Sequence, residues 1–116
     1  MREKSKIYSL SYASGIINTS GDNIVINAPG VKKQIAIKHI ILQNRTTTEN
    51  SVILKYGSTS ILPILLPTKG SGFTDEFHHC WEVGDNIQVI LNLSSATDVG
   101  YVIAYWIDQD WLMGGK

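Results

Sequence analysis

The stretch that most constrains the fold runs over residues 70–108, because its apolar residues alternate with polar ones and turn residues interrupt it at short intervals. Alternation is clearest over residues 86–93. One face there carries Ile87, Val89, Leu91 and Leu93, and the other carries Asn86, Gln88 and Asn92. A period of two residues predicts a β-strand with one buried face.

Residues that favour turns flank this strand on both sides. Gly84-Asp85-Asn86 precedes it, and Gly and Asn tolerate a positive φ while Asp bonds its own backbone. Residues 94–99 form the next turn cluster, and residues 101–107 are rich in aromatic and β-branched side chains. We therefore expect strands 86–93 and 101–107 to pair as an antiparallel hairpin.

The upstream chain predicts further short strands. They cover residues 7–12, with 13–18 as an extension or a separate strand, and then 24–27, 33–44, 52–56, 61–66, 73–77 and 79–83. Residues 33–44 are apolar on both faces in their second half, at Ile37, Ile40, Ile41 and Leu42, which predicts a central strand covered on both sides. Because proline donates no backbone hydrogen bond, Pro63 and Pro67 predict that residues 61–66 lie at a sheet edge or end early as a strand.

Eight or nine short strands and no helix pattern are typical of an all-β sandwich or barrel. We expect a single all-β domain of this kind over residues 7–108. A polar N-terminal arm, residues 1–6, precedes it, and a C-terminal tail, residues 109–116, follows it. A chain of 116 residues is long enough to bury one core without disulfides.

The charge and the cysteine content limit the classes of function that we expect for this chain. Ten basic and ten acidic residues give zero net charge, so we expect binding to neither nucleic acid nor membrane. Near-zero charge also does little to keep copies apart, which is compatible with self-assembly. Cys80 is the only cysteine and no apolar leader follows the charged N-terminus, so we expect synthesis in a cytoplasm.

Two clusters carry residue types used in catalysis or metal binding. His78-His79-Cys80, with His39 as a remote donor, suggests a metal site, but neighbouring strand residues point to opposite faces and cannot chelate one ion together. Asp75, Glu76, Glu82 and Asp85 suggest the paired carboxylates of a glycosidase, and we favour solvated rim charges instead. We therefore predict no enzyme activity, no metal and no cofactor.

Aromatic residues leave two interpretations open. Tyr8, Tyr12, Tyr56, Trp81, Tyr101, Tyr105 and Trp106 are candidates for a sugar-stacking platform or for core packing, of which we favour core packing. In the tail, Trp111, Leu112 and Met113 would dock either on their own subunit or on a neighbour, because exposed they would promote aggregation.

One pattern within residues 30–108 resembles a known family. It consists of Gly72-Phe73, Trp81, Gly84-Asp85-Asn86-Ile87, Leu91-Asn92-Leu93-Ser94 with Ala96, Val99-Gly100-Tyr101 and Tyr105. Two earlier segments, Lys33-Gln34-Ile35-Ala36-Ile37 and Val52-Ile53-Leu54-Lys55-Tyr56-Gly57, also sit where that family has strands. The whole is similar to small β-sandwich structural proteins of tailed bacteriophages.

The resemblance implies a single antiparallel β-sandwich, jelly-roll-like in its connections. It also implies a non-enzymatic virion protein made in a bacterial host. It would be a capsid decoration (cement) protein or a piece of a head fibre or tail. Its partners would be other copies of itself, with a trimer preferred, and phage capsid or other virion proteins. The expected contacts are Arg2, Lys4 and Lys6 in the arm and Trp111, Leu112 and Met113 in the tail. The alternative is a carbohydrate-binding module of a phage fibre or bacterial protein.

Overall fold

The computed structural model describes residues 10–67 and 72–108, with the side chains of residues 75–81 outside the description. Eight β-strands account for most of this part of the chain. They are β1 (Ser11–Ile17), β2 (Gly21–Ile26), β3 (Gln34–Asn44), β4 (Asn50–Tyr56), β5 (Thr59–Leu66), β6 (Gly72–Asp85), β7 (Val89–Leu93) and β8 (Val99–Asp108).

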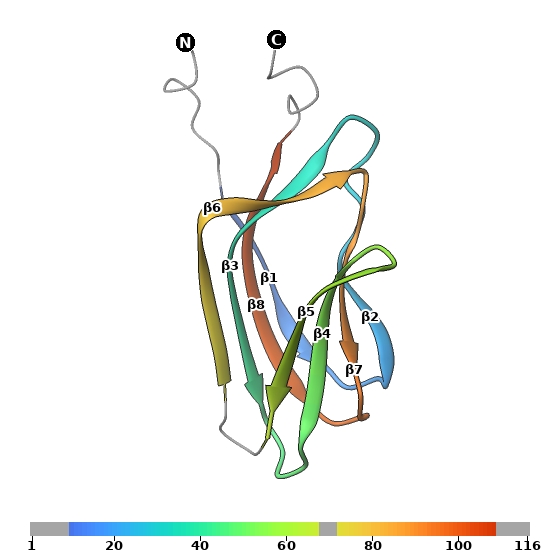
Figure 1. Ribbon diagram of the computed structural model, residues 1–116, viewed down its shortest axis with the longest axis vertical. Helices are drawn as coiled ribbons and strands as arrows, with labels where there is room; N and C mark the ends of the chain where they lie inside the picture. The colour runs from blue at the N-terminus through green and yellow to red at the C-terminus, as the bar shows by residue number, and fades with distance from the viewer. Residues whose placement is uncertain (1–9, 68–71, 109–116) are drawn as a thin grey trace.

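The strands form two antiparallel sheets that pack face to face (Figure 1). One sheet has the order β1-β8-β3-β6 and the other has the order β2-β7-β4-β5. Consecutive strands from β6 to β8 and from β1 to β4 thus alternate between sheets, as in a jelly roll built from two Greek keys. The predicted all-β sandwich with jelly-roll-like connections is confirmed.

The core fills the space between the sheets. Its fully buried side chains come mostly from the alternate positions of central strands, namely Ile40 and Leu42 of β3, Val52 and Leu54 of β4, Val89, Leu91 and Leu93 of β7, and Ile103 of β8. The buried face predicted over residues 86–93 is confirmed for Val89, Leu91 and Leu93, and Ile90 between them is buried as well. Ile87 contacts the core from the turn that precedes β7.

The predicted hairpin between residues 86–93 and 101–107 is wrong. β7 pairs with β2 and β4, whereas β8 lies in the other sheet between β1 and β3. The turn cluster between them crosses the sandwich and is anchored to other strands, since Ser94 N–H donates to Ser51 O at 2.9 Å and Arg45 N–H donates to Asp98 O at 3.1 Å. Alternation in each strand predicts burial but does not identify the strand beside it.

β3 is a central strand, as the sequence predicts, but the part of it that is covered on both faces is the first half and not the second. Gln34, Ile35, Ala36 and Ile37 in its first half are all buried. In its second half Ile40 and Leu42 are buried, whereas Ile41 is 38% exposed. The second half of β3 is therefore apolar on both faces, but only the face with Ile40 and Leu42 is covered. The face with Ile41 is open to solvent.

Two other expectations concern β5 and β6. β5 is an edge strand, as Pro63 predicts, and it is joined to β4 by a tight turn at Gly57, where φ is 61°. The separate strands expected over residues 73–77 and 79–83 are one strand, β6. Its pairing with β3 shifts register twice, and Figure 1 shows β6 bending and then crossing toward β7.

Candidate binding surface

The outer face of the β1-β8-β3-β6 sheet, which points away from the core, presents three aligned rows of side chains. Paired residues on antiparallel strands project to the same face, so register defines these rows. From β1 through β8 to β3 they are Tyr12–Ala104–His39, Ser14–Val102–Ile41 and Ile16–Gly100–Gln43. The three rows are called the outer-face patch below.

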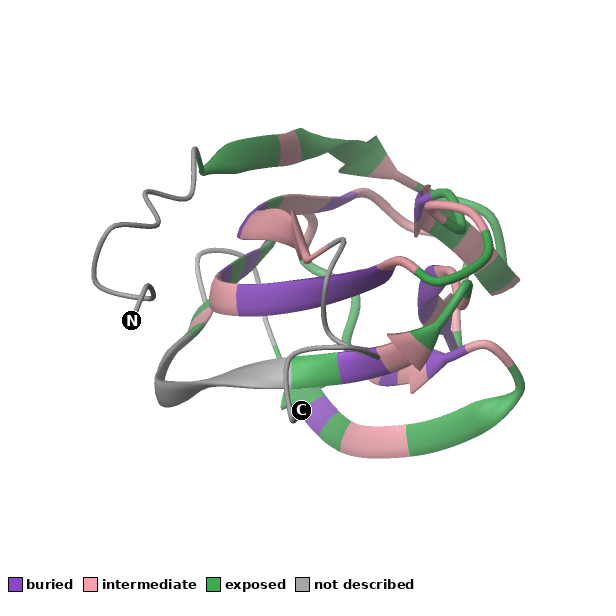
Figure 2. Ribbon diagram, turned by 90° about the horizontal axis from the view of Figure 1, so that it is seen from above, coloured by how far each residue is buried: buried purple, intermediate pink, exposed green. Residues whose placement is uncertain are grey.

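Apolar side chains in this patch are open to solvent. Tyr12 is 65% exposed, Ile16 52%, and Ile41 and Val102 38% each. Figure 2 shows that β1, which follows the grey N-terminal trace, is exposed over most of its length, in contrast to the buried strands of the interior. A contiguous exposed apolar group on a sheet face is typical of a protein–protein contact.

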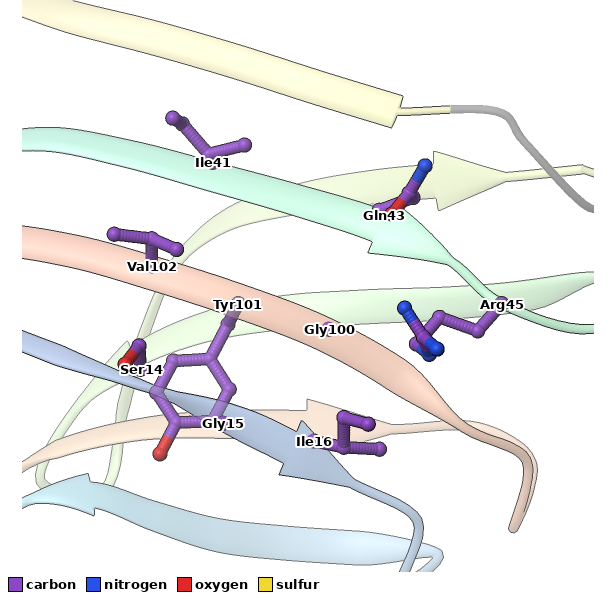
Figure 3. Close-up of a pocket in the computed structure, with 9 residues that line it drawn as sticks. All are labelled: Ser14, Gly15, Ile16, Ile41, Gln43, Arg45, Gly100, Tyr101 and Val102. Carbon is purple, nitrogen blue, oxygen red and sulfur yellow. The ribbon is translucent and has the colours of Figure 1, made fainter.

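A shallow hollow of about 320 Å³ lies within the outer-face patch. It forms because Gly100 has no side chain between Ile16 and Gln43. Figure 3 shows Val102 and Ile41 along one side and Arg45 at the end where β3 stops. A methyl group added at Gly100 would lie 3.4 Å from Arg45 Cδ, so the Arg45 side chain covers one end of the hollow.

The polar groups that line the hollow include one positive charge. Ser14, Gln43 and Arg45 contribute them, and Arg45 is the only side chain in the lining that carries a charge at neutral pH. Its guanidinium forms no ion pair with the described residues. Guanidinium groups bind carboxylates in a planar, two-point geometry, so an acidic group on a partner would complement this end of the hollow.

The outer face of the other sheet is different, because its polar residues bind one another. Lys55 Nζ lies 3.1 Å from Asp22 Oδ1, and Asn92 Nδ2 donates to the same oxygen at 2.6 Å. The hydrogen bond from Asn92 and then that from Lys55 hold the pKa of Asp22 below its ordinary value. Ile24 and Leu65 are exposed on this face, but they lie on its two edge strands with these polar contacts between them.

The residues predicted to bind partners lie outside the described residues. These are Arg2, Lys4, Lys6, Trp111, Leu112 and Met113. They precede β1 and follow β8, two of the strands that form the outer-face patch. Their contribution stays a prediction.

The metal and carboxylate clusters are only partly described. His39 lies on the outer face in the row of Ala104, and the side chains of His78, His79 and Cys80 are outside the description. Within the described residues, no three His, Cys, Asp or Glu side chains come together as a metal site. Asp85 has a structural role, since its Oδ1 accepts a hydrogen bond from Lys32 N–H at 2.6 Å.

Most of the described aromatic residues pack against the core. Tyr56 is 6% exposed, and burial raises the pKa of its hydroxyl. Tyr101 and Tyr105 are half-buried against the core, and the Tyr101 ring lies over Gly15, with its hydroxyl 3.4 Å from where a Cβ would be. Tyr12 is exposed instead, and it belongs to the outer-face patch.

Sequence reasoning missed this patch. The available signal was a break in alternation, because Ile40-Ile41-Leu42 and Val102-Ile103-Ala104 run apolar without interruption. On β3 that signal was interpreted as coverage by the chain itself. Only the register between β1, β8 and β3 shows that the extra apolar residues form one surface.

The chain matches no protein-family model, no curated protein and no solved structure. No helix long and apolar enough to cross a membrane occurs in the described part of the chain.

Proposed function

We propose that this chain is a non-enzymatic structural subunit of a virus particle, namely a capsid decoration protein of a tailed phage, that binds neighbouring subunits through the outer-face patch. The observation that carries the proposal is the patch itself, with four exposed apolar side chains, of which Ile16, Ile41 and Val102 line the hollow at Gly100. The apolar part would supply the binding free energy, and Arg45 would orient the partner.

Two further observations support the choice of particle. Double-sheet jelly rolls are common in viral capsid proteins, although this is an analogy of fold alone. The sequence pattern over residues 30–108 resembles phage β-sandwich structural proteins. Decoration proteins bind in many copies, so a modest contact per copy is sufficient for stable attachment.

The proposed function can be tested on virus particles, sedimented from cultures of the cells whose genome encodes this chain. We expect the chain to co-sediment with them at a fixed ratio to the major shell protein, measured by quantitative mass spectrometry. Purified chain should also rebind particles from which it has been stripped. If the chain is not enriched in any particle, the proposed function is wrong.

Gly100→Val tests whether the outer-face patch makes this contact. The new side chain fills the hollow, and we expect rebinding to weaken about tenfold or more, since overpacking a contact costs roughly 1–3 kcal/mol. Folding should be retained, because the nearest atoms are in the flexible Arg45 side chain. Ser60→Lys, at an exposed position of β5, is the control and should rebind normally.

Glycan binding is a second candidate function for the same surface. An exposed aromatic ring, Tyr12, stands near a hollow that carries Ser14, Gln43 and Arg45, and sugars are bound by such combinations of apolar and polar groups. A glycan array distinguishes the candidates. Specific binding to one sugar class that is lost in Tyr12→Ala would favour the glycan function over the structural one.

A further inference from the structure

The two sheets have four edge strands, and three of them carry features that discourage pairing with another chain. β2 contains Asp22 and a register shift between Ile24 and Ile26. β5 contains Pro63, and β6 has four acidic residues in its sequence and two register shifts against β3. Charges, prolines and bulges at edges are how β-proteins prevent unwanted strand addition.

β1 has none of these features. Its seven residues, SYASGII, include no charge and no proline, and all seven pair with β8 in one unbroken register from Ser11↔Tyr105 to Ile17↔Val99. Five of the seven residues are exposed. A regular, uncharged and exposed edge strand is a template for another strand.

We infer that β1 pairs with β1 of a second copy of this chain, antiparallel across a two-fold axis at Ser14. The inference deepens the proposed function, on which it rests, by naming the contact between copies. Two copies related by a two-fold axis present the same strand to each other in opposite directions, as antiparallel pairing requires. Because β1 carries no charged residue, no like charges face each other within the paired strands.

The register follows from the length of β1. Ser14 is its middle residue, so an axis at Ser14 pairs all seven residues of each strand. Tyr12 then lies opposite Ile16 of the second copy on the outer face, an aromatic and β-branched pair of the kind that stabilises neighbouring strands. On the inner face Ala13 lies opposite Gly15, so small residues meet at the junction.

This pairing joins the two β1-β8-β3-β6 sheets into one continuous sheet. The two outer-face patches then lie next to each other, with Tyr12 and Ile16 of both copies at the junction, so the partner meets a larger apolar surface. The arrangement predicts a dimer in place of the trimer expected from the sequence.

The mass of the full-length chain in solution, measured by sedimentation, tests the pairing. We expect wild-type protein to have twice the mass of one chain. Ser14→Lys should halve that mass, because two lysines would face each other at the axis. The matched control, Ser60→Lys on β5 of the other sheet, should stay dimeric, and circular dichroism should show both variants folded.

Cross-linking tests the register. Opposed Cα atoms of antiparallel strands are about 4.5–5.5 Å apart, within the range that a disulfide spans. With Cys80 replaced by Ser, Ser14→Cys should form a disulfide-linked dimer under mild oxidation, and Ser60→Cys should not. A monomeric wild type, or a dimer that survives Ser14→Lys, overturns the inference.

The two proposals fail in different ways. If Ser14→Lys leaves a self-associated protein and Gly100→Val disrupts it, copies associate through the outer-face patch and the β1 pairing is wrong. If the β1 dimer forms but the chain binds no particle, the pairing is retained and the proposed function is wrong. A monomer that adds an unrelated peptide strand to β1 also contradicts the inference.

Discussion

Single residues set the turns at the end of the sandwich where β6 stops. Gly84 has φ of 112° and Asn86 has φ of 53°, both in the left-handed region that the turn prediction at Gly84-Asp85-Asn86 requires. Asn86 Oδ1 also accepts a hydrogen bond from Gly30 N–H at 2.9 Å, and Asn86 N–H donates to Lys33 O at 2.8 Å. These contacts dock the turn before β3 onto the turn before β7.

Gly84→Ala should therefore destabilise the fold. A left-handed conformation costs an L-residue about 1–2 kcal/mol, and the new Cβ would lie 3.0 Å from Ile87 Cδ1. Urea denaturation measures the free energy of unfolding. Gly100→Ala is the matched control, since φ there is not left-handed and the nearest atom is in a flexible side chain. Equal losses in the two variants would contradict this account of the turn.

At the scale of the element, β8 shows how one strand serves two surfaces. Ile103 is fully buried between the sheets, and its neighbour Val102 is 38% exposed in the outer-face patch. Both are β-branched and apolar, so residue type alone does not distinguish the core side from the open side. Pairing with β1 and β3 on either flank makes that distinction.

Lysine at these two positions should have opposite effects. Ile103→Lys buries an unpaired charge, and we expect it to lower the free energy of unfolding by about 4 kcal/mol or more. Val102→Lys should change that free energy by less than about 1 kcal/mol, because the side chain reaches solvent. Val102→Lys should nevertheless abolish particle rebinding. Thermal denaturation and the rebinding assay together measure both effects, and normal rebinding of Val102→Lys would contradict the role of the patch.

At the scale of the whole molecule, buried asparagines hold the two sheets together at the other end of the sandwich. Asn50 in β4 is fully buried and binds the β7–β8 connection, donating to Ser95 O at 3.0 Å and to Thr97 Oγ1 at 2.8 Å. Its Oδ1 accepts hydrogen bonds from Ser95 N–H and Ser94 Oγ, each at 3.1 Å. The connection that replaces the predicted hairpin thus shares four hydrogen bonds with one side chain, in addition to the backbone contacts at Ser94 and Asp98.

Asn50→Ala should destabilise the protein by about 2–3 kcal/mol, because it leaves part-buried backbone groups of Ser95 without their Asn50 partner and opens space at a fully buried position. Chemical denaturation measures this loss, and exposed Asn27→Ala is the control, expected to change stability by less than about 0.5 kcal/mol. Hydrogen exchange at Ser95 N–H should accelerate in Asn50→Ala. An unchanged exchange rate would show that other contacts hold the connection.

The sequence by itself determined the all-β class, the turn at Gly84-Asp85-Asn86, the buried face of β7 and the edge position of β5. These properties depend on local backbone preferences and on alternation within one strand, which neighbouring residues encode. Pro63 could be interpreted correctly because a missing N–H restricts the strand wherever it lies.

Only the tertiary structure decided which strands are neighbours. β7 and β8 lie in different sheets, and the outer-face patch exists because β1, β8 and β3 are adjacent although they are far apart in sequence. Alternation within a strand indicates which of its faces is buried and which is exposed. It carries no information about which other strand pairs with it. β1 likewise stands out as an edge strand without charge, proline or register shift only when the other three edge strands are known.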